Sequence, residues 1–227
     1  MTVTLHWMNA SAAHRVLWLL LELNVPYELK IHMRNPKTYL APDELRRVHP
    51  LGKVPVVEDD GETLIESGYI VDHLISKYGK DTELAPKNED ERKKVQVSLH
   101  HAMSLLPAEV MLLTTQKIRS ESPFIAKPIT NIIANRIDSG FVRQDLVKQF
   151  DYLENMLKEN GTGFFVGDHL SGADIIYIFP IENVLATPYF EKDRYPLLRK
   201  WLKTMHERPA LKNSYDLVPD EDPSPKL

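Results

Sequence analysis

The chain has 227 residues, 43% of them hydrophobic, and a formal net charge of −4. That length fits one large domain or two small ones with an ample core, and the mixed charges exclude the basic face that a nucleic-acid-binding protein needs. There is no cysteine, which excludes disulfides, thiolate metal sites and a cysteine nucleophile.

Membrane and secretion signals are not expected in this chain. No stretch approaches the roughly 20 apolar residues that cross a bilayer, and the first residues lack a basic region followed by an apolar core. The last three residues, Pro225, Lys226 and Leu227, differ at one position from a peroxisomal signal. We expect a cytoplasmic protein, with the peroxisome as the alternative, and an acidic disordered tail over 217–227.

The first 80 residues alternate between strand and helix patterns. In chain order they predict a strand over 2–8, a helix over 11–24, a strand over 27–33, a short charged helix over 42–48, strands on both sides of an Asp60-Gly61 turn, and a helix over 66–78. This βαβ-ββα order favours a small α/β unit with a mixed sheet.

The rest of the chain has only helical periodicity after a polar linker over 81–88. The predicted helices cover 89–118, then 124–159 with an interruption around Ser139-Gly140, then 172–187 and 197–207. The fold class is therefore an α/β domain followed by an all-α domain that ends near residue 216.

Ser11 lies between the first strand and the first helix. A serine in this position is typically the N-cap, whose oxygen accepts a hydrogen bond from a first-turn N–H. Alternatively, it donates its hydroxyl to an anion at the helix N-terminus, where free N–H groups favour negative charge. The residue alone leaves both interpretations open.

Pro55 stands in a stretch, GKVPVVED, that otherwise predicts a strand. Proline has no N–H for a sheet ladder, so it belongs at an edge or a bulge. A cis bond between Val54 and Pro55 would turn the Val54 N–H and C=O out of the sheet, where they could pair with an extended peptide-like ligand.

Glu66 and Ser67 follow the last predicted strand and begin a helix. They could cap that helix, since acids and hydroxyls are favoured at its N-terminus. They could also hold an amino-acid head group, with the Glu66 carboxylate on the ammonium and the Ser67 hydroxyl on the carboxylate.

Together these stretches resemble the cytosolic glutathione transferases, and most of all their bacterial and fungal GTT-type members. The carrying segments are HWMNASAAHRVLWLLLELNVPYEL, NPKTYLAPDELRRVHPLGKVPVVED, LIESGYIVDHL and FFVGDHLSGADIIYIFPIENV. In the last segment, the spacing of Ser171 and Asp174 predicts a capping box. The resemblance implies a thioredoxin-like domain over 1–80 and a helical bundle over 89–216.

The resemblance implies a glutathione site in the N-terminal domain. Pro55 matches the family's cis-proline, and the Val54 backbone would pair with the cysteinyl residue of glutathione. Glu66 and Ser67 would hold the γ-glutamyl end. Lys53 falls near the expected place of the glycine carboxylate, with a solvated turn lysine as the alternative.

The resemblance also implies a hydrogen-bond donor to the glutathione thiolate. Ser11 matches the serine of the serine-type transferases, four residues before Arg15. Asn9 on the same loop can donate its amide in the same way, so the choice between Ser11 and Asn9 stays open. No metal or further cofactor is implied, because glutathione is a co-substrate.

A hydrophobic electrophile is expected to bind between the two domains, where pockets tend to form. The residues predicted to line that pocket are Trp7, Met8, His101, Ser104 and Leu105, although such residues at these spacings are often plain core. Members of the family are usually homodimers joined through the third and fourth helices, so a homodimer is expected.

The function that follows is conjugation of the glutathione thiolate to electrophilic small molecules, with reduction of organic hydroperoxides as a further activity. The alternative is a non-catalytic binding or regulatory module that keeps the same fold. A glutaredoxin-like thiol oxidoreductase is excluded, because it needs a cysteine where Ser11 stands.

Overall fold

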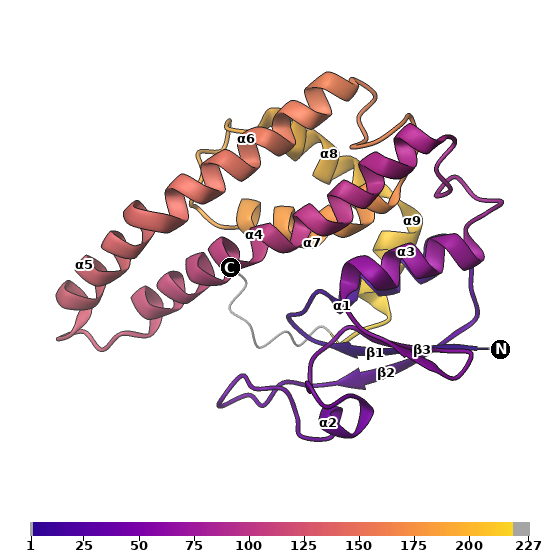
Figure 1. Cartoon of the computed structure of the whole chain (residues 1–227). Coiled ribbons are helices and arrows are strands. Elements are labelled where there is room, and N and C mark those ends of the chain that lie inside the picture. Colours follow the sequence, from indigo (N-terminus) through magenta and orange to yellow (C-terminus); the bar gives the residue numbers. More distant parts are fainter. Residues whose placement is uncertain (1, 220–227) are drawn as a thin grey trace.

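The computed structural model describes residues 2–219, which form an α/β part followed by a helical part (Figure 1). This is the predicted thioredoxin-like domain followed by an all-helical one. The elements of the first part are β1 Val3–Met8, α1 Ala13–Glu22, β2 Tyr27–His32, α2 Leu45–Val48, β3 Val56–Asp59, β4 Glu62–Leu64 and α3 Ser67–Tyr78.

The sheet has the strand order β2-β1-β3-β4. Strand β1 runs parallel to β2 and antiparallel to β3, and β4 returns antiparallel to β3. All six residues of β1 are buried, as expected for a strand with neighbours on both sides. Asp60 and Gly61 form the predicted turn, with φ of +50° and +85°, the left-handed conformation that a tight hairpin turn needs.

Pro55 lies immediately before β3, which begins at Val56. Its missing N–H therefore takes nothing from the sheet ladder. The Val54–Pro55 peptide bond is cis, as the resemblance predicted.

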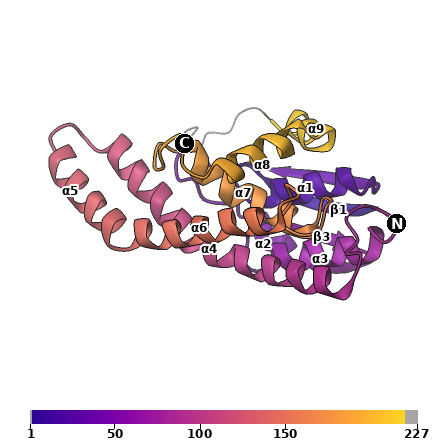
Figure 2. The same cartoon turned by 90° about the horizontal axis from the view of Figure 1, so that it is seen from above.

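The helical part is dominated by one long hairpin. Its elements are α4 Glu89–Glu121, α5 Lys127–Ile137, a π-helical turn Asp138–Val142, α6 Arg143–Asn160, α7 Gly172–Ala186, α8 Pro196–Glu207 and α9 Pro209–Asp216. The π-helical turn stands where the interruption around Ser139-Gly140 was predicted. The ends of α4 and α6, with α5 between them, extend as an arm beyond the other helices (Figure 2).

Helix α7 is the buried centre of the helical part, as its apolar sequence predicted. The predicted capping box is present: Ser171 accepts from a first-turn N–H, and Asp174 accepts from the Ser171 N–H at 3.0 Å. Asp174 also accepts from the Trp201 Nε1–H at 2.9 Å, which ties α7 to α8.

Side chains from α1 join the two parts. The Arg15 Nη1 donates to the Ile176 carbonyl of α7 at 2.7 Å. Arg208, before α9, forms a bidentate pair with Glu22 at the end of α1, with its Nε 2.7 Å from a carboxylate oxygen. Helix α3 packs on α4 and α7. Helices α1, α3, α4 and α7 thus meet between the two parts. No helix within residues 2–219 is long and apolar enough to cross a membrane.

Candidate functional site

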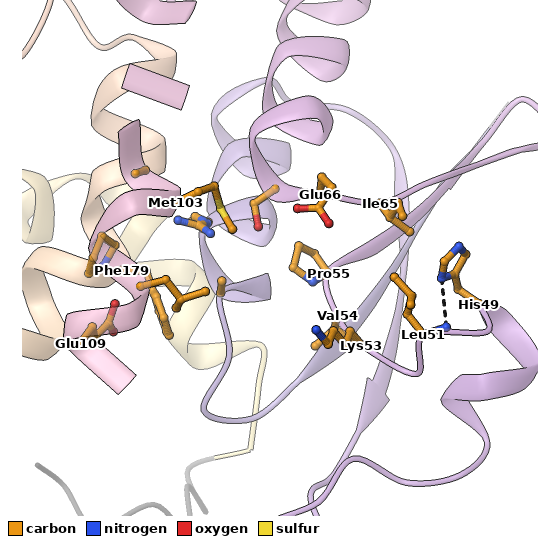
Figure 3. A pocket seen from close by; sticks show the side chains of 16 residues that line it. His49, Leu51, Lys53, Val54, Pro55, Ile65, Glu66, Met103, Glu109 and Phe179 are labelled. Carbon is orange, nitrogen blue, oxygen red and sulfur yellow. Dashed lines mark hydrogen bonds between the residues drawn. The ribbon is translucent and has the colours of Figure 1, made fainter. Parts of the chain in front are cut away.

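A cavity lies where the α/β part meets α4 and α7 (Figure 3). The α/β part lines it with Ala12, Arg15, His49, Leu51, Lys53, Val54, Pro55, Ile65, Glu66 and Ser67. The helical part lines it with Ala102, Met103, Leu106, Glu109, Phe179 and Pro180. One side is therefore polar loop and helix N-terminus, and the other is mostly apolar.

The five residues predicted to bind glutathione all line this cavity. Val54 lies beside it, on the loop before β3, with the exposed Lys53 next to it. Ser67 is buried and is the first residue of α3. Figure 3 shows the Glu66 side chain facing the cavity near Pro55. The arrangement offers a carboxylate and a helix N-terminus side by side, which suits an amino-acid head group.

The two candidate thiolate donors do not line the cavity, which reaches Ala12, the N-cap of α1, and Arg15 within that helix. The Ser11 hydroxyl donates to the Met8 carbonyl at 2.6 Å and accepts from the Ala13 N–H at 3.3 Å. It therefore supports the turn before α1, but the N-cap of α1 is Ala12, which has no side-chain cap hydrogen bond, so the prediction that Ser11 is the N-cap was wrong.

Asn9 is almost fully buried on the same loop. Its side-chain oxygen accepts from the Arg34 N–H at 2.8 Å. Its amide nitrogen has no hydrogen-bond partner among residues 2–219. Buried donors rarely stay unpaired. The Asn9 amide therefore has a hydrogen bond left to donate, whereas the Ser11 hydroxyl already donates to the Met8 carbonyl.

The five residues predicted for the electrophile pocket lie elsewhere. Trp7, Met8 and Leu105 are buried in the core. His101 contacts the Tyr177 hydroxyl at 2.9 Å and Gln149 at 2.8 Å, and the exposed Ser104 donates back to the His101 carbonyl. None of the five lines the cavity.

A different face of α4 lines the cavity, through Ala102, Leu106 and Glu109. These positions follow the i, i+4, i+7 spacing of a single helix face. Sequence reasoning missed this face, and it also missed Phe179 of α7. A signal was present, since Glu109 is the one acid in the apolar run SLLPAEVMLL.

Two buried titratable groups alter the electrostatics of the cavity. Burial raises the pKa of Glu109 to about 7, although a hydrogen bond from Asn183 and the charge of Arg15 act to lower it. Burial also lowers the pKa of Arg15 to about 10, so the guanidinium stays charged at neutral pH. Within residues 2–219 no group of three or more His, Cys, Asp or Glu side chains is arranged to hold a metal ion.

Comparisons with known protein families match both parts of the chain. Residues 5–83 match the model of the glutathione S-transferase N-terminal domain, and residues 130–215 match that of the C-terminal domain. Glutathione S-transferase 1 of Saccharomyces cerevisiae is 31% identical over 211 residues, which cover 89% of each chain.

Other relatives agree over similar lengths. Glutathione S-transferase 3 of Schizosaccharomyces pombe is 30% identical over 223 residues, covering 96% of this chain and 88% of the relative. A glutathione transferase homolog from Lodderomyces elongisporus, crystallised with two GSH per subunit, has the same fold with a TM-score of 0.75 at 19% identity, over 96% of this chain and all of its own. The chain belongs to the glutathione S-transferase family.

Proposed function

We propose that the protein is a glutathione transferase, which joins the sulfur of glutathione to an electrophilic small molecule. The observation that carries the proposal is the polar end of the cavity, where the cis Val54–Pro55 bond lies beside Glu66 and Ser67. The same site could reduce organic hydroperoxides, because that reaction also needs only a bound thiolate and an apolar pocket.

Each part of glutathione has a complementary group at that end. Glu66 takes the γ-glutamyl ammonium, and Ser67 with the N-terminus of α3 takes its α-carboxylate. The Val54 backbone pairs with the cysteinyl residue as a strand would. Lys53 is exposed at the cavity edge and takes the glycine carboxylate, with His49 close by on the same wall.

The thiol must then ionise. A free thiol with a pKa of about 8.5 is only a few per cent thiolate at neutral pH. A hydrogen bond to a charged group contributes about 1.5–3 kcal/mol and a helix N-terminus about 0.3–1. Since one pKa unit corresponds to about 1.36 kcal/mol, these effects lower the pKa of the bound glutathione thiol by about 1 to 3 units. Ser11 and Asn9 are the candidate donors.

The assembly and location expected from the resemblance belong to the same proposal. We propose two domains over 1–80 and 89–216, joined by 81–88, in a homodimer located in the cytoplasm. The C-terminal Pro-Lys-Leu, with most of the tail expected to be disordered, lies outside the described residues.

A non-catalytic glutathione-binding module is the second candidate. It is favoured by one observation: the Ser11 hydroxyl donates to the Met8 carbonyl, and neither Ser11 nor Asn9 lines the cavity. In such a module, glutathione would bind with the pKa of its thiol unchanged.

The deciding experiment is the thiolate absorbance of protein-bound glutathione as a function of pH, for the protein, Ser11→Ala and Asn9→Ala. We expect ionisation well below the pKa of the free thiol, and loss of that effect in one of the two variants. Ser120→Ala, an exposed serine of α4, is the matched control. Binding with an unchanged thiol pKa, and no conjugation, would favour the second candidate.

A further inference from the structure

The apolar side of the cavity contains a buried acid that the binding of glutathione does not use. Glu109 is 2% exposed and lines the cavity together with Met103, Leu106 and Phe179. Figure 3 shows it across the cavity from Glu66, with Phe179 beside it. It therefore lies on the side left for the electrophile once glutathione occupies the polar end.

The Glu109 carboxyl group is held in place from α7. The Asn183 Nδ2 donates to its Oε1 at 2.7 Å. Arg15, from α1, lines the same cavity and is the charged group whose charge acts to lower the pKa of Glu109, while Asn183 is neutral. Glu66 and Lys53, the other charged groups of the cavity wall, belong to the polar end.

Arg15 is held by the same helix. Its Nη1 donates to the Ile176 carbonyl, and its guanidinium carbon lies 5.9 Å from the centre of the Phe179 ring. Its Nε has no hydrogen-bond partner within residues 2–219. A fixed positive charge thus lies ready to stabilise a negative charge that appears beside it.

A purely structural role explains this arrangement less well. Burying a carboxyl and a guanidinium carries a large desolvation cost for each group, and well-packed apolar residues usually serve a core as well or better. A buried carboxyl on a cavity wall, close to where a reaction takes place, is instead the typical setting of a general acid.

We propose that Glu109 is the general acid of the conjugation reaction, and that the pocket is built for α,β-unsaturated carbonyl compounds. This inference rests on the proposed transferase function and names its substrate class. Aryl halides, by contrast, release a halide ion that needs no proton.

The step balances without an added co-reactant. A lone pair of the glutathione thiolate forms a C–S bond to the β-carbon, and the C=C electron pair shifts so that negative charge gathers on the carbonyl oxygen. Glu109 gives its proton to that enolate oxygen, and its own carboxylate is left beside Arg15. The enol becomes the ketone through water, and Glu109 regains a proton from the solvent, to which the glutathione thiol gave one earlier.

The acidity of Glu109 suits this role. Burial raises its pKa to about 7, and a general acid works best when its pKa lies near the working pH. Because the protonated form is required, the acid contribution is complete below this pKa and is lost as the pH rises through it. Thiolate formation has the opposite pH dependence, so the reaction with an enone should show a bell-shaped profile.

The test compares two substrates across pH, in the protein and in Glu109→Gln. Benzylideneacetone is an enone that needs the proton, and chlorodinitrobenzene is an aryl chloride that does not. We expect Glu109→Gln to lower the ratio of the two kcat/KM values, enone over aryl chloride, by about 10²-fold or more, the usual contribution of a general acid. In Glu109→Gln, the rate with the enone should also no longer fall above about pH 7.

Glu121→Gln is the matched control, because it removes an exposed carboxylate from the same helix. The thiolate absorbance of bound glutathione reports separately that Glu109→Gln is folded and loaded. An unchanged ratio, or equal losses with both substrates, would overturn the inference and leave the transferase function standing. If the unaltered protein conjugates neither substrate, both the role of Glu109 and the proposed transferase function are overturned.

Discussion

Glu66 has a backbone conformation that residues with side chains rarely adopt. Its φ is +66° and its ψ is 114°, and α3 begins at the next residue. Its carbonyl accepts from the Ile70 N–H at 2.9 Å, so the first turn of α3 holds the residue in place. A non-glycine residue in such a region costs about 1–3 kcal/mol and persists only where its surroundings impose it. Because Glu66 faces the cavity, we interpret this strain as the cost of aiming its carboxylate at a ligand.

Two substitutions separate this strain from the binding role. Glu66→Gly and Glu66→Ala both remove the carboxylate, so both should weaken glutathione binding by about 10-fold or more, as expected for loss of a charged hydrogen bond. Only glycine relieves the strain. The stability gained in this way exceeds the roughly 0.5–1 kcal/mol that glycine loses through its greater conformational freedom in the unfolded chain. Glu66→Gly should therefore melt a few degrees above Glu66→Ala, about 2–4 °C for each kcal/mol.

The measurements are thermal unfolding without ligand and calorimetric titration with glutathione. Glu62→Gly and Glu62→Ala, at an exposed glutamate of β4 with no positive φ, are the control pair. At position 62, the alanine variant should be more stable than the glycine variant. An alanine variant at position 66 that is as stable as the glycine variant would contradict the strain argument.

At the scale of elements, Asp59 fastens the hairpin of β3 and β4 to α3. It is buried at the end of β3, and it accepts hydrogen bonds from His73 at 2.8 Å, Lys77 at 2.8 Å and Tyr78 at 2.7 Å. All three donors lie on α3. Since Glu66 connects the hairpin to α3, this cluster fixes the segment on both sides of the proposed ligand contact.

The cluster predicts a loss of stability in acid. Burial acts to raise the pKa of Asp59, but the hydrogen bonds from Lys77, His73 and Tyr78 outweigh it and hold the pKa below its ordinary value. A lowered folded-state pKa means that the stabilisation is complete above the unfolded pKa of about 3.9 and is lost as the pH falls through the folded value.

Asp59→Asn should therefore cost about 1.5–3 kcal/mol at neutral pH and show a flatter decline in acid, measured as the free energy of urea unfolding. Asp60→Asn is the control, because its ion pair with Lys77 is more exposed than the Asp59 carboxylate and should matter by about 0–1 kcal/mol. If the free energy of unfolding of Asp59→Asn falls in acid as steeply as that of the parent protein, other carboxylates cause the loss of stability.

Features decided by neighbouring residues could be predicted from the sequence. The Asp60-Gly61 turn and the Ser171–Asp174 capping box each depend on local chemistry, and both were predicted correctly. The polar end of the cavity also belongs to one short stretch, from Lys53 to Ser67, which carries its own pattern.

Features decided by tertiary packing could not. Which face of α4 meets the cavity depends on how α4 lies against α3 and α7, and the sequence pattern alone led to His101, Ser104 and Leu105 on other faces of that helix. Likewise, Ser11 forms its hydrogen bond with the Met8 carbonyl, a backbone group whose direction depends on the loop after β1. Helix α9 was missed because it follows α8 with only Arg208 between them and packs on α1, far away in the sequence.

For the whole molecule, large apolar side chains remain exposed over α3, α4 and the arm. Tyr69 of α3 is 55% exposed and Val97 of α4 is 58% exposed, and Phe124 at the tip of the arm is 89% exposed. On α5, Ile129, Ile132 and Ile133 are at least half exposed as well. Exposed apolar side chains on helices that pack together, such as α3 and α4, are candidates for an interaction site, and a second copy of the chain is the partner expected from the family resemblance.

We therefore expect a dimer in solution, with the pair of helices α3 and α4 at its interface. A charge placed there would be buried without a partner, which costs about 2 kcal/mol or more and raises the dissociation constant about 30-fold. Val97→Glu should accordingly shift the species seen by light scattering from twice the chain mass toward the chain mass as the protein is diluted. Phe124→Glu, the same kind of change at the tip of the arm, should leave the dimer intact. If Phe124→Glu dissociates the dimer and Val97→Glu does not, the interface lies on the arm. If the protein is monomeric before any substitution, the expectation of a dimer is refuted.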